Sequence, residues 1–289
     1  MKSGFKILET PRDALQSISA VIPTSNKVDL LKAALNTGFD VVDIGSFVSP
    51  KIIPQFADMA EVLKMLDKST INSKVFMLTG NIKGALLAAD WDLVDYIGFP
   101  FSLSPTFLKR NINATIDQAW QTLQEIHDIC EKKSKNLWIY FSMGFGNPYG
   151  DPVDFNEMLK WTGTFHQIGI KNITLSDITA VSSEEQIASY YQQLSSNYPE
   201  IEFGLHLHVK PNVNYHGKLK AAHENGCIFF DGVTGGVGGC PMTGYEMLTN
   251  LPTKQLIDFA KKENLNHGIL QDQFHSYQNI AFYTFNLTT

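Results

Sequence analysis

An alternation of apolar strand-like segments with amphipathic helical segments runs along the whole chain and limits its possible folds more than any other feature. The strand-like segments are residues 5–10, 39–45, 73–79, 93–99, 137–143, 171–177, 201–209 and 227–233. The segments with apolar residues at helical spacing are residues 27–36, 55–68, 82–89, 116–132, 154–168, 183–197, 213–225 and 253–262. Strands that alternate with helices in this way predict a parallel sheet with helical connections.

Eight strand-helix repeats without a linker or a low-complexity tract favour a single-domain (β/α)8 TIM barrel over a doubly wound sheet. Residues 1–289 would form one catalytic domain, and the segment from about residue 265 would pack on the barrel or extend it. No G-x-G-x-x-G follows the first strand, and no G-x-x-x-x-G-K-[ST] occurs. Nucleotide-binding folds therefore lose their main support.

Charge and cysteine content restrict the partners and the compartment. The chain has 23 basic and 29 acidic side chains, and no basic run is long enough for a nucleic-acid or membrane surface. Its three cysteines, Cys130, Cys227 and Cys240, argue against a disulfide framework and agree with a reducing compartment. No signal peptide or membrane span is evident, so we expect a cytoplasmic protein without nucleic-acid or membrane partners.

Two segments close to each other in sequence carry candidate chemistry. His206 and His208 lie two residues apart in a strand-like FGLHLHV segment, so both imidazoles face the same side and can bind one metal ion. Structural or surface histidines are the alternative explanation. Cys240 lies in a glycine-rich segment, FFDGVTGGVGGCPMTG, which predicts a mobile loop that carries a thiol.

Ionisable residues and this thiol follow the carboxyl ends of several predicted strands. In a (β/α)8 barrel those ends meet at one mouth, where the active site lies. The residues placed there are Arg12, Asp13, Asp43, Asp177, His206, His208 and Cys240.

Motifs spread over almost the whole length carry a family resemblance. They are ETPRDALQ (9–16), SFVSPKIIPQFAD (46–58), NIKG (81–84), KRNIN (109–113), ITLSD (173–177), HLH (206–208) and GGVGGCP (235–241). With these motifs the chain resembles the 3-hydroxy-3-methylglutaryl-CoA lyases, which belong to the metal-dependent lyase and aldolase TIM barrels. The SFVSPK and GGCP motifs are the most specific part of the resemblance.

The resemblance implies that an acyl-CoA substrate, 3-hydroxy-3-methylglutaryl-CoA, is cleaved to acetyl-CoA and acetoacetate, a reaction of leucine degradation. It implies a divalent cation, Mg²⁺ or Mn²⁺, and a homo-oligomer. The implied metal ligands are Asp13, His206, His208 and Asn250. A salt bridge for Asp13 and a helix cap for Asn250 are the alternatives without the resemblance.

The implied roles of the other residues follow from the same reaction. Arg12 would stabilise an enolate-like oxygen, and Asp43 would orient Arg12. Either Asp13 or His206 would act as the base, and Cys240 would donate a proton from a loop that closes over the substrate. The implied substrate-binding residues are Ser46, Thr174 and Asp177.

Four substitutions are among the departures from the family pattern. Val209 replaces an Asp, Asp43 a Glu, Ile178 a Thr and Ala14 a Gly. Because of these departures, a closely related 3-hydroxyacyl-CoA is also a candidate substrate. Two other functions stay open: an aldol-type acyl-CoA condensing synthase, and a catalytically impaired barrel that acts as a binding protein.

Overall fold

The protein folds into a closed barrel of parallel strands. The computed structural model describes residues 4–210, 213–239 and 248–286. Within these residues, neighbouring strands pair in parallel around a complete ring, which the pairing of the first strand with the eighth closes. The strands are β1 (Lys6–Glu9), β2 (Val41–Gly45), β3 (Lys74–Leu78), β4 (Tyr96–Phe101), β5 (Asn136–Phe141), β6 (Asn172–Asp177), β7 (Glu202–Val209) and β8 (Cys227–Gly232). The predicted single-domain (β/α)8 TIM barrel is thereby confirmed.

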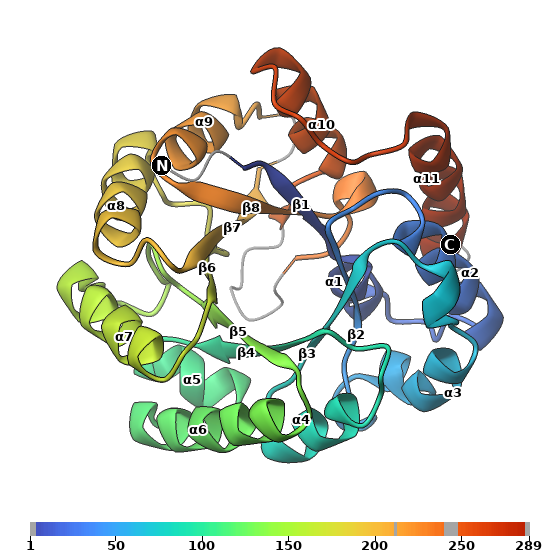
Figure 1. The fold of residues 1–289 in the computed structure, drawn as a ribbon, viewed down its shortest axis with the longest axis horizontal. Helices are drawn as coiled ribbons and strands as arrows, with labels where there is room; N and C mark the ends of the chain where they lie inside the picture. The colour runs from blue at the N-terminus through green and yellow to red at the C-terminus, as the bar shows by residue number, and fades with distance from the viewer. Residues whose placement is uncertain (1–3, 211–212, 240–247, 287–289) are drawn as a thin grey trace.

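Helices form an outer ring around these strands (Figure 1). In the described part of the chain they are α1 (Pro11–Ser17), α2 (Thr24–Leu35), α3 (Met59–Lys64), α4 (Ile82–Ala89), α5 (Pro105–Asn111), α6 (Ile116–Lys132), α7 (Phe155–Gln167), α8 (Glu184–Asn197), α9 (His216–Glu224), α10 (Thr253–Lys262) and α11 (Gln271–Asn286). Each of the longer helices buries an apolar face, as α6 does with Leu123 and Ile126. None of the helices in the described ranges has the length and apolar character needed to cross a membrane.

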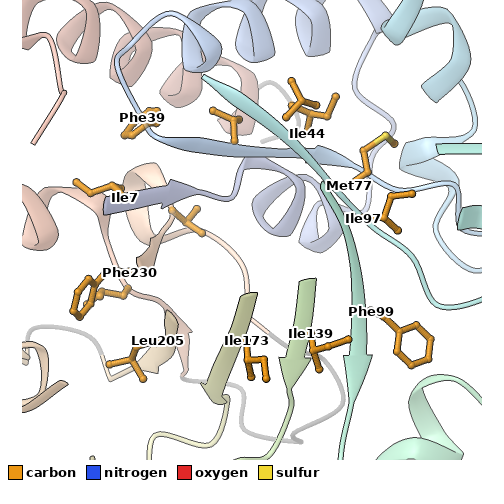
Figure 2. Close-up of a cluster of buried hydrophobic side chains, with 14 of the residues drawn as sticks. Ile7, Phe39, Ile44, Met77, Ile97, Phe99, Ile139, Ile173, Leu205 and Phe230 are labelled. Atoms are coloured by element: carbon orange, nitrogen blue, oxygen red, sulfur yellow. The ribbon is translucent and has the colours of Figure 1, made fainter. Parts of the chain in front are cut away.

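Strand alternation divides the buried side chains into two layers. Figure 2 shows Ile7, Ile139 and Leu205 in the outer layer, where they point from their strands toward the helices. A second buried cluster, which includes Leu8 and Trp138, uses the opposite faces of the strands and fills the barrel interior. Polar residues that alternate along a strand with residues of the outer layer therefore face the barrel interior, where they can form a site.

The helix predicted over residues 55–68 is shorter in the structure. A 3-10 turn, η1 (Pro54–Phe56), precedes α3, and a second, η2 (Lys68–Thr70), follows it. The Lys27 ammonium, which is buried, donates to the backbone oxygen of Gln55 at 2.7 Å. The N–H groups of Phe56 and Ala57 donate to the oxygens three residues before them, Ile53 and Pro54, so the segment begins as a 3-10 turn and not as a regular α-helix.

Helices α1, α5 and α11 were absent from the sequence prediction. The first two have seven residues each and begin at Pro11 and Pro105, so they are too short for a clear apolar period. Helix α11 packs beside α2 and buries Phe274 and Tyr277, whose rings contact Phe39 at centroid distances of 6.3 and 5.8 Å. These contacts hold the chain after residue 270 against the outside of the barrel.

A glycine in β4 makes room for an aromatic ring inside the barrel. A Cβ atom at Gly98 would lie 2.0 Å from Cζ of Phe76, whose ring is packed between Trp138 and Tyr140. We predict that Gly98→Ala lowers the free energy of unfolding in urea by about 1–3 kcal/mol, because the packed ring cannot move aside. Adding Phe76→Leu should recover part of this loss, whereas equal stability of Gly98→Ala and the parent would contradict the packing.

Candidate active site

Arg12 and Asp13 enter the site from the turn that follows β1. Pro11 occupies the first helical position of α1, where its missing N–H is not needed, and Arg12 and Asp13 follow it in the first turn of the helix. The N–H and the hydroxyl of Thr10 both donate to the backbone oxygen of Gly232, at 2.9 and 3.1 Å. The start of α1 is thereby attached to the end of β8, so both side chains lie at the carboxyl end of the barrel.

His206 and His208 reach the same space from β7. Leu205 and Leu207 face the outer core, so the histidines between and after them face the barrel interior. Nε2 of His206 lies 3.8 Å from Oδ2 of Asp13. One ligand atom from each of Asp13, His206 and His208 lies within 4.8 Å of the others, which is the spacing of a metal-binding group. The structure thus brings together three of the four predicted metal ligands.

Asn250, the fourth predicted ligand, is held beside His208. It belongs to β9 (Thr249–Asn250), a short strand that pairs antiparallel with β7 and places Asn250 opposite His208. Its Nδ2 donates to the backbone oxygen of Val237 at 3.0 Å. Nδ1 of His208 and Oδ1 of Asn250 are buried, and the described residues give neither atom a hydrogen-bond partner. Buried polar atoms of this kind need an explanation, and a cation near Asn250 would supply one.

The pKa values of His208 and Asp13 are shifted in directions that suit metal binding. Burial lowers the pKa of His208 to about 4, and His206 adds to this shift. Burial disfavours the charged form of Asp13, but Arg12 and the two histidines hold the pKa of this carboxyl below its ordinary value. A neutral imidazole and an ionised carboxylate are the forms that ligate divalent cations.

Arg12 is fixed by three acceptors. Its Nε donates to Oδ2 of Asp43 at 2.8 Å, and its Nη1 donates to Asp13 at 2.9 Å and to Gln16 at 3.2 Å. The carboxylates of Asp43 and Asp13 raise the pKa of Arg12, although burial alone would lower it. None of the described residues accepts a hydrogen bond from Nη2, so this part of the guanidinium can bind an anionic group.

Sequence reasoning missed Asp231, which orients His206 from β8. Oδ2 of Asp231 lies 3.0 Å from Nδ1 of His206 and accepts from the hydroxyl of Tyr140 at 2.8 Å. Burial would lower the pKa of His206, but the hydrogen bond and charge of Asp231 raise it overall. The available signal was an acidic residue inside the apolar strand CIFFDGV, at a position that alternation directs into the barrel.

The predicted substrate-binding residues are placed differently. Ser46 directly follows β2 and is buried. Thr174 is buried beside Gly204, two residues before His206 along β7, and its hydroxyl accepts from the indole of Trp138 at 2.9 Å. Asp177 accepts from the backbone N–H groups of residues 181 and 182 and holds the loop after β6. Neither Thr174 nor Asp177 joins the metal-type cluster, and Cys240 lies outside the described residues.

A closed (β/α)8 barrel whose mouth gathers an arginine, carboxylates and histidines has the architecture of a TIM-barrel enzyme with a candidate metal site at the carboxyl ends of its strands. A family model described as HMGL-like matches residues 5–280. The mitochondrial hydroxymethylglutaryl-CoA lyase of Bos taurus is 32% identical over 268 residues, which cover 91% of this chain and 80% of that protein. The chain therefore belongs to the HMGL-like family and is a lyase.

Other similar proteins agree with this assignment. The hydroxymethylglutaryl-CoA lyase of Bacillus subtilis is 27% identical over 231 residues, which cover 80% of this chain and 76% of that protein. A solved structure of an HMG-CoA lyase from Acinetobacter baumannii, in complex with coenzyme A and 3-methylmalate, has a TM-score of 0.88 and 27% identity. The match covers 98% of this chain and 92% of that one.

We predict that Asp231→Asn weakens Mn²⁺ binding about 10- to 100-fold, as expected when the partner of a ligating histidine is lost. An amide nitrogen at this position can donate to Nδ1 of His206, which moves the ring proton to Nε2, where a cation would bind. Titration calorimetry measures the affinity. Asp95→Asn is a matched control, because Asp95 accepts from the N–H of Val75 on a strand outside the site. Parental affinity in Asp231→Asn would contradict the role of Asp231.

Proposed function

We propose that the protein cleaves 3-hydroxy-3-methylglutaryl-CoA, or a closely related 3-hydroxyacyl-CoA, to acetyl-CoA and acetoacetate. The observation that carries this proposal is the group formed by Asp13, His206 and His208 next to Arg12, in a chain of the HMGL-like family. Coenzyme A in the related Acinetobacter structure supports an acyl-CoA as the substrate class.

The donor set fits a divalent cation such as Mg²⁺ or Mn²⁺. Asp13, His206, His208 and Asn250 would hold the ion with carboxylate, imidazole and amide donors, and no described cysteine lies among them. The free buried atoms of His208 and Asn250 support this assignment. When bound, the ion would polarise the substrate oxygens and ease ionisation of the 3-hydroxyl group.

The reaction breaks the bond between C2 and C3 of the acyl group. The 3-hydroxyl loses its proton and becomes the ketone of acetoacetate, while the bonding electrons move to C2 and form the thioester enolate of acetyl-CoA. The Asp13 carboxylate has more than one oxygen lone pair, so it can hold the ion and still accept the hydroxyl proton. Nε2 of His206, 3.8 Å from Oδ2 of Asp13, can accept this proton only if it does not hold the ion. Both are buried, which excludes competing water from the proton transfer.

Arg12 is suited to stabilise the enolate. Its contacts with Asp43 and Asp13 fix the plane of the guanidinium and leave Nη2 for the thioester oxygen, where negative charge develops. A fixed donor needs no reorganisation as the charge forms. Ser46, Thr174 and Asp177 are proposed to bind the substrate around this centre.

Three of the departures from the family pattern are compatible with this chemistry. Val209 and Ala14 are buried in the outer core, and Ile178 packs with Phe107 and Met143 in a separate apolar cluster. None of the three belongs to the metal-type group. The fourth, Asp43, retains a carboxylate that binds Arg12. These substitutions are therefore compatible with the proposed cleavage.

Incubation of the purified protein with Mn²⁺ and a panel of 3-hydroxyacyl-CoAs tests the function. We expect equimolar acetyl-CoA and acetoacetate from 3-hydroxy-3-methylglutaryl-CoA, and no products after EDTA treatment. Condensation of acetyl-CoA with a 2-oxo acid in place of cleavage would identify a synthase. Metal binding without turnover of any acyl-CoA would identify a binding protein, and either result would overturn the proposal.

We predict that Cys240→Ser keeps the fold and metal affinity but lowers kcat by about two to three decades. Cys240 would protonate C2 of the enolate, and a hydroxyl is a far weaker acid than a thiol. Steady-state kinetics measures the change, and Cys130→Ala, on the outer helix α6, is the control. Cys130 and Cys227 are buried, so alkylation of the native protein should inactivate it through Cys240. Parental turnover in Cys240→Ser would show that another acid acts.

A further inference from the structure

Glu9, the last residue of β1, is a buried carboxylate outside the proposed reaction. Alternation directs it with Ile7 toward the helices, away from the barrel interior. Its Oε1 accepts from the backbone N–H of Thr234 at 2.7 Å and from the hydroxyl of Tyr277 at 2.9 Å. Its Oε2 accepts from the hydroxyl of Thr253. One carboxylate thereby joins the 3-10 turn η3 (Thr234–Gly236), the start of α10 and the middle of α11.

Thr234 and Thr253 lie on either side of the segment that contains Asn250. The N–H of Val233 donates to the backbone oxygen of Leu251 at 3.0 Å, and the N–H of Thr253 donates to the oxygen of Val233 at 3.2 Å. The N–H of Leu251 donates to the oxygen of Leu207 on β7, at 3.1 Å. Asn250 is therefore held between β7 and the residues that Glu9 binds.

The cost of burying Glu9 indicates that its hydrogen bonds matter. The carboxylate is fully buried, and no described cation pairs with it. Burial raises the pKa of Glu9 to about 7, and the bonds from Thr253, Thr234 and Tyr277 act in the opposite direction. A buried carboxylate without a cation is tolerated only when several donors satisfy it, and here the donors come from three separate elements.

We propose that Glu9 is a positioning residue that holds Asn250 where it can ligate the divalent cation, and that Tyr277 extends this link to the C-terminal helix. The inference rests on the proposed function, because it requires the cation to bind at Asp13, His206, His208 and Asn250. Glu9 touches neither the ion nor the substrate and acts through Thr234 and Thr253.

Mn²⁺ affinity of the substrate-free protein, measured by electron paramagnetic resonance, tests this role. Glu9→Gln keeps the shape but leaves one donor without an acceptor, and we expect about tenfold weaker binding. Thr253→Val, which removes a single hydroxyl, should weaken binding in the same direction by a smaller factor. Asp40→Asn is the control, since Asp40 also binds β1, through the N–H of Ile7, but at the amino end of the barrel. The Mn²⁺ affinity of the Asp40→Asn variant should equal that of the parent protein.

A double-mutant cycle separates positioning from general damage. If Glu9 acts through Asn250, Glu9→Gln should add little to the loss caused by Asn250→Ala. Fully additive losses, or parental affinity in both Glu9→Gln and Thr253→Val, would overturn the inference. If His206→Ala abolishes binding but Asn250→Ala has no effect, the inference fails while the metal site stands. If the parent protein does not bind Mn²⁺, both the inference and the proposed function fail.

Discussion

Closure of the barrel through β1, β8 and β7 is the constraint on which the site depends. Parallel pairing of β1 with β8, and of β8 with β7, brings the first residues of the chain beside residues more than two hundred positions later. Arg12 and Asp13 can meet His206 and His208 only because these strands are neighbours in the ring. Short β9 then adds Asn250 to the edge of β7. Each side chain is thus placed by backbone hydrogen bonds, which are stiffer than contacts between loops.

The charges in this space are balanced by direct contact. Arg12 binds Asp43 and Asp13, while Asp231 binds His206 and Tyr140. Because the groups are buried, each contact is stronger than it would be in water, and each unpaired atom is more costly. His208 and Asn250 each have one buried atom without a hydrogen-bond partner among the described residues, and a cation bound between them would offset this cost.

Sequence periodicity was sufficient to predict the fold, because the fold is determined by which side chains are buried. All eight predicted strands are present, and α4, α6 and α10 have the predicted limits. The helix over residues 55–68 was predicted too long because its first residues form the 3-10 turn η1, which the buried Lys27, far away in sequence, contacts through the backbone oxygen of Gln55. Long-range side-chain contacts of this kind leave no local pattern.

The same distinction applies to the site. The ligand pair His206 and His208 was recognisable from strand alternation, and Asp13 and Asn250 from the family resemblance. Asp231 and Glu9 act through partners on other elements, so their roles emerge only once the strands are assembled. Neither the resemblance nor the contacts of the described residues test the role of Cys240, which stays a prediction.

Anomalous X-ray scattering from crystals grown with Mn²⁺ tests the central claim most directly. The account predicts one strong peak per chain, within bonding distance of Asp13, Nε2 of His206, His208 and Oδ1 of Asn250. It also predicts that the peak disappears in the His206→Ala variant while the barrel is unchanged. Fully loaded crystals without a peak at this position, or with Mn²⁺ bound only elsewhere, would contradict the account.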